Sequence, residues 1–136
     1  MRIAVIALIA AFLTANVATA QDGRQEAAQA VISAQIDAFR NNDFDRAFGY
    51  ASPGIQGLFG TPENFGAMVR GGYAMVLNPK VTRFGEAVED GTALLQRLYV
   101  EGADGAGYLL EYRMQPVGDG WRIAGVKILP APVPSV

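Results

Sequence analysis

The hydrophobic pattern of the chain changes at Asn78-Pro79, and this change restricts the possible folds more than any other feature. Before it, apolar residues recur every three to four positions, as they do on one face of a helix. After it, apolar and polar residues alternate, which is typical of strands. Helices followed by strands predict an α+β domain in which N-terminal helices pack on a β-sheet.

Three helices are predicted before the change. The first covers residues 23–41, where apolar side chains recur on one face. The second starts at Asp43, whose side chain can cap the first turn, and ends at Ser52-Pro53-Gly54. The third runs from Pro62 to about Arg70, because Thr61 is a suitable cap and proline is favoured at the first helical position.

Four strands are predicted after the change, and short glycine-containing turns separate them. Consecutive strands joined by such turns form an antiparallel meander. The predicted strands are Lys80 to Ala87, Ala93 to Glu101, Tyr108 to Gln115 and Trp121 to Leu129. We therefore expect a curled antiparallel sheet that covers the helices.

The first twenty residues predict a cleaved secretory signal peptide. Arg2 supplies a positive charge, and the apolar run over residues 3–13 is shorter than the roughly 20 residues that span a bilayer. Ala18-Thr19-Ala20 has the small residues of a cleavage site. We expect an exported protein, periplasmic or secreted, with a single domain over residues 21–129. Residues 130–136 are rich in proline and predict a flexible tail.

The composition excludes several kinds of chemistry. The chain has no histidine and no cysteine, and no carboxylates cluster at helical ligand spacing, so zinc, iron and cysteine nucleophiles lack their usual ligands and groups. A net charge of −2 without a basic cluster makes nucleic acid a poor partner. The sequence therefore predicts no cofactor, no metal site and no catalytic residue.

Several short motifs, in this order, point to a known family. They are Ile36-Asp37-Ala38-Phe39 with Asp43, Ala47-Phe48, Ala51-Ser52-Pro53-Gly54-Ile55 with Phe59-Gly60, Phe65 with Met68-Val69, Tyr73, Pro79, Val81 with Phe84-Gly85, and Gly120-Trp121-Arg122-Ile123 with Gly125. They resemble a bacterial family known only as domain of unknown function 4864. The order of helices and strands also resembles the cone-shaped nuclear-transport-factor-2-like, or cystatin-like, superfamily.

These resemblances imply a fold and leave the activity open. The superfamily includes ketosteroid isomerases, dehydratases and polyketide cyclases, but also binding and dimerisation modules without catalysis. Its usual functional place is the hollow between sheet and helices. The resemblance implies a site in that hollow, and it carries no catalytic residue over to this chain.

Five residues are candidates for binding a ligand in the hollow, namely Gln35, Tyr73, Arg97, Tyr112 and Trp121. Gln35 falls inside the apolar stripe of its helix, so its amide needs hydrogen bonds, either from the backbone or from a ligand. The aromatic residues either line a cavity for a flat apolar ligand or form the core. Strand register decides whether Arg97 and Tyr112 face inward.

Glu111 is an acidic residue in the middle of a predicted strand, and its direction is open. On the inner face it would be a buried acid that needs a partner such as Arg97, Arg113 or Lys127. On the outer face it would form an ordinary cross-strand ion pair.

Three functions follow as hypotheses. The first is a non-enzymatic domain that forms a homodimer through its sheet and binds a small apolar ligand or an envelope protein. The second is a cofactor-independent isomerase, cyclase or lyase in which Glu111 acts with Tyr112 or Tyr73. The third is an assembly role for the tail around Pro130 to Pro134.

Overall fold

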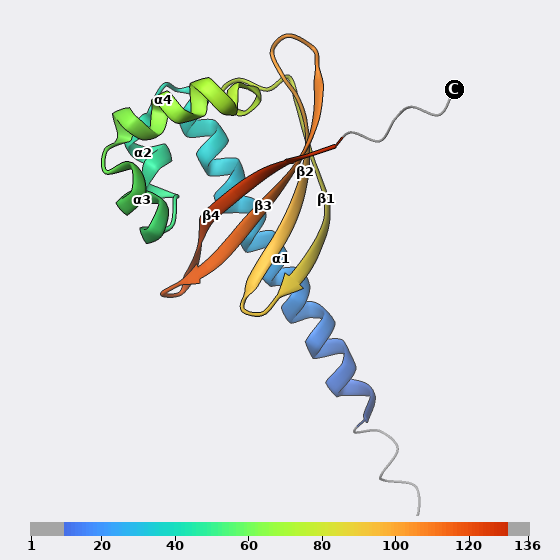
Figure 1. The fold of residues 1–136 in the computed structure, drawn as a ribbon. Helices are drawn as coiled ribbons and strands as arrows, with labels where there is room; N and C mark the ends of the chain where they lie inside the picture. The colour runs from blue at the N-terminus through green and yellow to red at the C-terminus, as the bar shows by residue number, and fades with distance from the viewer. Residues whose placement is uncertain (1–9, 131–136) are drawn as a thin grey trace, which may run out of the picture.

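The computed structural model describes residues 10–130 and the side chains of residues 22–130. Within this part of the chain, helices precede a single sheet (Figure 1). The helices are α1 (Ala10–Arg40), α2 (Phe44–Gly49), α3 (Pro53–Phe59), α4 (Pro62–Gly72) and the short 3-10 helix η1 (Ala74–Val76). The strands are β1 (Val81–Asp90), β2 (Ala93–Glu101), β3 (Gly107–Val117) and β4 (Gly120–Leu129). The α+β prediction is confirmed.

The sheet is an antiparallel meander, as its turn sequences predict. Its strand order is β1-β2-β3-β4, and each strand pairs antiparallel with the next. The register shifts between Phe84 and Ala87 in β1, and again between Arg113 and Met114 in β3. Such bulges increase the local twist and bend a sheet. The sheet therefore curls around α1 and stays open at β1 and β4 (Figure 1).

Helix α1 and the inner face of the sheet form the core. The predicted apolar stripe of α1 is buried along its length, at Ala28, Ile32, Ile36 and Phe39. The buried side chains of the facing strands include Leu94, Leu98 and Val100 of β2 and Leu110, Tyr112 and Met114 of β3, with the polar Gln96 of β2 among them. Burial of these side chains supplies the main driving force for folding. The described residues contain no disulfide that could add to it.

Helix α1 begins earlier in the chain than the predicted helix. It extends back to Ala10, through the end of the predicted signal peptide, and ends at Arg40. In the described part of the chain, no helix has both the length and the hydropathy required to cross a membrane. Cleavage of residues 1–20 stays a prediction. The flexible tail also stays a prediction, because its residues 131–136 lie outside the described range.

The segment between the second and third predicted helices is itself a helix, α3, and the prediction that Ser52-Pro53-Gly54 merely ends a helix is wrong. Helix α2 already ends at Gly49. Ser52 then caps α3, because its Oγ accepts a hydrogen bond from the Ile55 amide at 3.3 Å, and Pro53 occupies the first turn. A proline that stops one helix is equally suited to start the next.

A short parallel bridge ties the start of α3 to the last strand. The Ser52 amide donates to the Ile123 carbonyl at 2.8 Å, and the Ile123 amide donates to the Tyr50 carbonyl at 2.9 Å. Residues 50–52 thus add an edge contact to β4, although some seventy positions of sequence separate them. This bridge fixes where α3 stands relative to the sheet.

Replacing Ser52 by alanine should lower the free energy of unfolding by about 1 kcal/mol, because the Ile55 amide loses its capping oxygen. Urea unfolding of the purified protein measures the change. Ser33→Ala is the matched control, since Ser33 is exposed within α1 and alanine favours helix there. Equal stability of the Ser52 variant and the wild type would show that the cap contributes nothing.

Candidate functional site

A cavity of ≈ 370 Å³ lies between the helices and the open half of the sheet. Helices α3 and α4 form one wall, strands β3 and β4 form the other, and α1 contributes from beneath. Most of the lining is hydrocarbon, with Phe39 of α1, Ile55 of α3, Met68 of α4 and Ile123 of β4 among its residues. Leu58, which is 73 % exposed, lies at the rim. The cavity is thus an apolar container with an exposed hydrophobic edge.

The polar side chains that line this cavity are Gln35, Tyr73 and Tyr112. None of its described lining residues carries a charge. An aspartate or glutamate acting as general base, and a lysine or arginine acting as anion partner, are therefore both missing from the wall. The polar groups that the described lining offers are therefore all uncharged.

Gln35 holds α1 against α2. Its Nε2 donates to the carbonyl of Ala47 at 3.1 Å, so the amide is bound to the backbone, which is one of the two alternatives that its sequence position left open. The same side chain also borders the cavity. Its Nε2 is therefore engaged within the protein, while the residue still contributes polar surface to the cavity.

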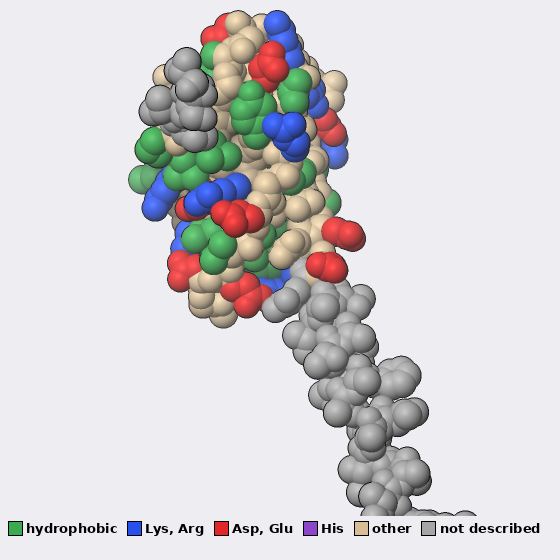
Figure 2. All heavy atoms as spheres, turned by 90° about the vertical axis from the view of Figure 1, so that its right-hand side faces the viewer, with side chains coloured by type: hydrophobic (Ala, Val, Ile, Leu, Met, Phe, Trp, Pro, Cys, Tyr) green, Lys and Arg blue, Asp and Glu red, His purple; other side chains and the backbone are tan. Residues whose placement is uncertain are grey.

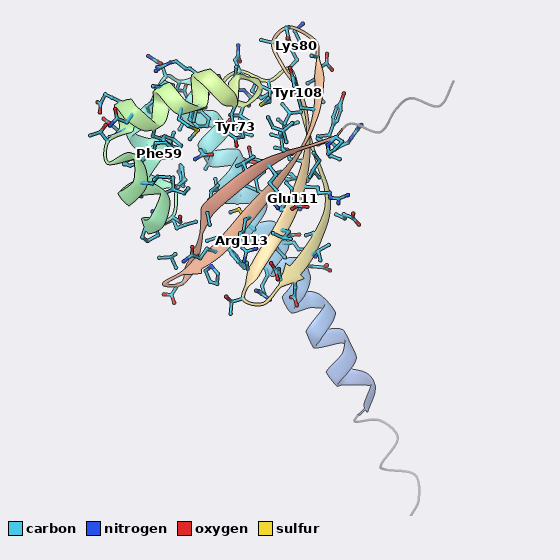
Figure 3. The ribbon with its side chains drawn as sticks, viewed as in Figure 1. Phe59, Tyr73, Lys80, Tyr108, Glu111 and Arg113 are labelled. Atoms are coloured by element: carbon cyan, nitrogen blue, oxygen red, sulfur yellow. The ribbon has the colours of Figure 1, made fainter. Side chains whose placement is uncertain are left out.

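Tyr73 connects α4 to the sheet across one end of the cavity. It follows the last residue of α4, and its hydroxyl donates to the carbonyl of Val126 in β4 at 3.0 Å. Figure 3 shows Tyr73 and Phe59 on the helical side of the sheet. Since Tyr73 joins two walls, it sets the width of the cavity at this end.

Tyr112 lies in the middle of β3 with its side chain only 1 % exposed. Burial raises the pKa of its hydroxyl well above the usual range, so this group stays protonated at neutral pH. The hydrogen bonds of the described side chains include none to this hydroxyl, and every fully enclosed polar side-chain atom among them has a partner. The Tyr112 hydroxyl therefore borders the cavity as an unused donor.

Arg97 and Trp121 do not line the cavity. Arg97 lies on the outer face of β2, where its Nη1 is 3.0 Å from Glu86 Oε1. Trp121 is the second residue of β4, and the Arg24 guanidinium of α1 lies 5.3 Å from the centre of its ring. The structure thus brings three of the five candidate residues together and leaves these two outside, and a binding role for each stays a prediction.

Glu111 occupies the outer face of the sheet, the second of its two predicted placements. It pairs across the strands with Lys127, and its Oε2 lies 3.7 Å from Arg97 Nε. Because successive strand residues point to opposite faces, Glu111 and Tyr112 lie on opposite sides of β3. The carboxylate and tyrosine of the proposed isomerase, cyclase or lyase are therefore not combined in the cavity.

Sequence reasoning missed the α3 wall of the cavity. Ile55, Leu58 and Phe59 recur at helical spacing directly after a serine-proline start signal, and this pattern could have identified them as one face of a helix. Gly54 and Gly57 lie beside and among these residues, and glycines at such spacing also indicate turns. The helical spacing of these residues therefore predicts the helix correctly, and the glycines favour turns wrongly.

A second, polar hollow of ≈ 300 Å³ lies where α2 and α4 begin. Asp43, Asp45, Glu63 and Arg70 border it. The Asp43 carboxylate caps α2 by accepting from the Arg46 amide at 3.1 Å, as predicted. No group of three potential metal ligands occurs among the described residues. Asp43 in this hollow therefore has a structural role, as the cap of α2.

Comparison with known proteins gives one match. A family model with the description "Domain of unknown function (DUF4864)" matches residues 7–136, nearly the whole chain. No curated protein and no solved structure matches the chain. What the cavity does must therefore be inferred from its own residues.

Proposed function

The chain belongs to the family described as domain of unknown function DUF4864, and on that premise we propose that it binds a small, mainly apolar ligand in the cavity between α3, α4 and the sheet. The observation that carries the proposal is the size and lining of this cavity. Its ≈ 370 Å³ falls within the range of small-molecule sites, about 300–1,000 Å³. Such sites combine an apolar wall with a few placed polar groups, as this one does.

We also place the fold in the nuclear-transport-factor-2-like, or cystatin-like, superfamily. The support is architectural: a curled, open antiparallel sheet surrounds a long helix, and a hollow opens between sheet and helices. In this superfamily binding modules and enzymes share that hollow. The absence of charged groups from the described lining favours the binding role over the enzymatic one.

Export and self-association belong to the same proposal. Export is supported by the predicted signal peptide at residues 1–20. A homodimer through the sheet is supported by exposed aliphatic side chains on β1, where Val81 and Val88 reach solvent. Basic and acidic side chains are interspersed with hydrophobic ones on this side of the molecule (Figure 2). An envelope protein is the other partner that this face would suit.

Filling the cavity should weaken ligand binding without unfolding the protein. The probe is N-phenyl-1-naphthylamine, an uncharged aromatic dye whose fluorescence rises in apolar surroundings. The wild type should give a saturable rise, and Ile55→Trp should weaken binding about tenfold or more, because the indole would occupy the space for the dye. Fluorescence titration measures both affinities.

Ile128→Trp is the matched control, since Ile128 is 47 % exposed on β4 and is not part of the cavity lining. It should bind the dye as the wild type does. Urea unfolding of each variant separates loss of the cavity from loss of the fold. If the wild type shows no saturable binding, or if Ile55→Trp binds as tightly as the wild type, the proposal is wrong.

A further inference from the structure

The cavity has three polar side chains, and two of them already donate a hydrogen bond to the backbone. Gln35 directs its Nε2 to the carbonyl of Ala47, and Tyr73 directs its hydroxyl to the carbonyl of Val126. No described side chain or backbone group accepts a hydrogen bond from the Tyr112 hydroxyl. Among the polar side chains of the described lining, Tyr112 is therefore the one with no hydrogen bond to the protein.

A donor in such a place recognises oxygen. Removing a hydroxyl from bulk water is unfavourable in free energy unless a new hydrogen bond replaces the lost hydration. The surrounding walls are hydrocarbon, so a ligand acceptor is the group that would complete the site. A carbonyl or hydroxyl oxygen carried on an apolar body satisfies both requirements.

The same lining argues against a charged ligand. No lysine or arginine is among the described lining residues, and the chain has no histidine. A carboxylate placed in this cavity would be buried without a counter-ion, which is strongly unfavourable. The remaining acceptor oxygens of Gln35 and Tyr73 would add to that penalty.

We propose that the natural ligand is an uncharged molecule with an apolar body and one carbonyl or hydroxyl oxygen, and that the Tyr112 hydroxyl donates a hydrogen bond to this oxygen. This inference rests on the proposed function and makes it more specific. Tyr112 is then a specificity-determining residue, because it distinguishes an oxygenated ligand from a hydrocarbon of the same shape.

Three probes of matched shape test the proposal, namely 2-acetylnaphthalene, 2-isopropenylnaphthalene and 2-naphthoate, which are a ketone, its hydrocarbon analogue and an anion. Calorimetric titration of the wild type should give the tightest binding for the ketone. Tyr112→Phe should weaken ketone binding about three- to tenfold and leave hydrocarbon binding unchanged, because it removes one hydrogen bond and no shape. Tyr108→Phe, in the same strand but outside the cavity, should change neither.

The stability of the ligand-free protein gives a second measurement. Tyr112→Phe should unfold at the same or a higher urea concentration than the wild type, because the hydroxyl has no protein partner to lose. A clear loss of stability would assign the hydroxyl a structural role and overturn the proposal.

The binding outcomes distinguish the two levels of inference. If the ketone and the hydrocarbon bind equally, if Tyr112→Phe weakens both alike, or if 2-naphthoate binds most tightly, the role of Tyr112 is wrong and the apolar cavity still stands as a site. If neither the ketone nor the hydrocarbon binds the wild type, the proposed function itself fails, and this inference fails with it.

Discussion

Replacing Phe65 by alanine is expected to lower the free energy of unfolding by about 4 kcal/mol. Phe65 is 5 % exposed and lies at the centre of an aromatic cluster. Its ring centroid is 6.2 Å from that of Phe39, 5.4 Å from that of Phe48 and 6.1 Å from that of Phe59. Alanine removes burial and leaves a void that these neighbours, on three different helices, cannot fill together. Equilibrium unfolding in urea measures the loss.

Two further variants make this prediction specific. Leu58→Ala, at a side chain that is 73 % exposed, should change stability by less than about 0.5 kcal/mol. Phe65→Leu keeps most of the apolar volume and should fall between the other two. Because Phe65 also lines the cavity, the alanine variant should bind the dye differently even where it remains folded. A Phe65→Ala protein as stable as Leu58→Ala would contradict the central position of the cluster.

The second large effect is expected at Gln96, where leucine should cost about 3 kcal/mol despite its similar size. Gln96 is fully buried in β2. Its Nε2 donates to the carbonyls of Gly85 at 3.0 Å and Arg97 at 2.9 Å, and its Oε1 accepts from Gln29 Nε2 at 3.3 Å. Leucine would leave these groups without partners beside the β1 bulge. Urea unfolding again gives the value.

Gln115→Leu is the matched control, since Gln115 is an exposed glutamine in the neighbouring strand β3. It should change stability by less than about 0.5 kcal/mol. If Gln96→Leu were as stable as this control, the Gln96 amide could not be what holds the bulge of β1. Hydrogen exchange of the β1 amides would then show no faster opening than in the wild type.

The parts of the fold that the sequence predicts well are those where a single face is buried. Helix α1 meets the sheet along one stripe, so Ile32 and Ile36 recur at helical spacing and expose the pattern. Strand β2 is harder to interpret, because Leu95 and Tyr99 on its outer face are as apolar as Leu94 and Leu98 on its inner face. Its existence could be predicted from this composition, but its inward side could not.

The candidate site was predicted in part for the same reason. Gln35 stands out because it interrupts an apolar stripe, and the structure places it at the cavity. Arg97 and Tyr112 depended on register, which two bulges modify and which only the folded chain determines. The unused donor of Tyr112 could not be predicted at all, because the absence of a partner is a property of three-dimensional packing.

The parallel bridge between Ala51 and Ile123 has a consequence for biosynthesis. Helices α3 and α4 are translated well before β4, yet β4 supplies the Ile123 and Val126 wall of the cavity and the carbonyl that receives Tyr73. In the folding chain, the apolar faces of these helices therefore stay uncovered until β4 has joined the sheet. A chain that terminates before Gly120 would retain most of its residues but would lack the β4 wall of the cavity.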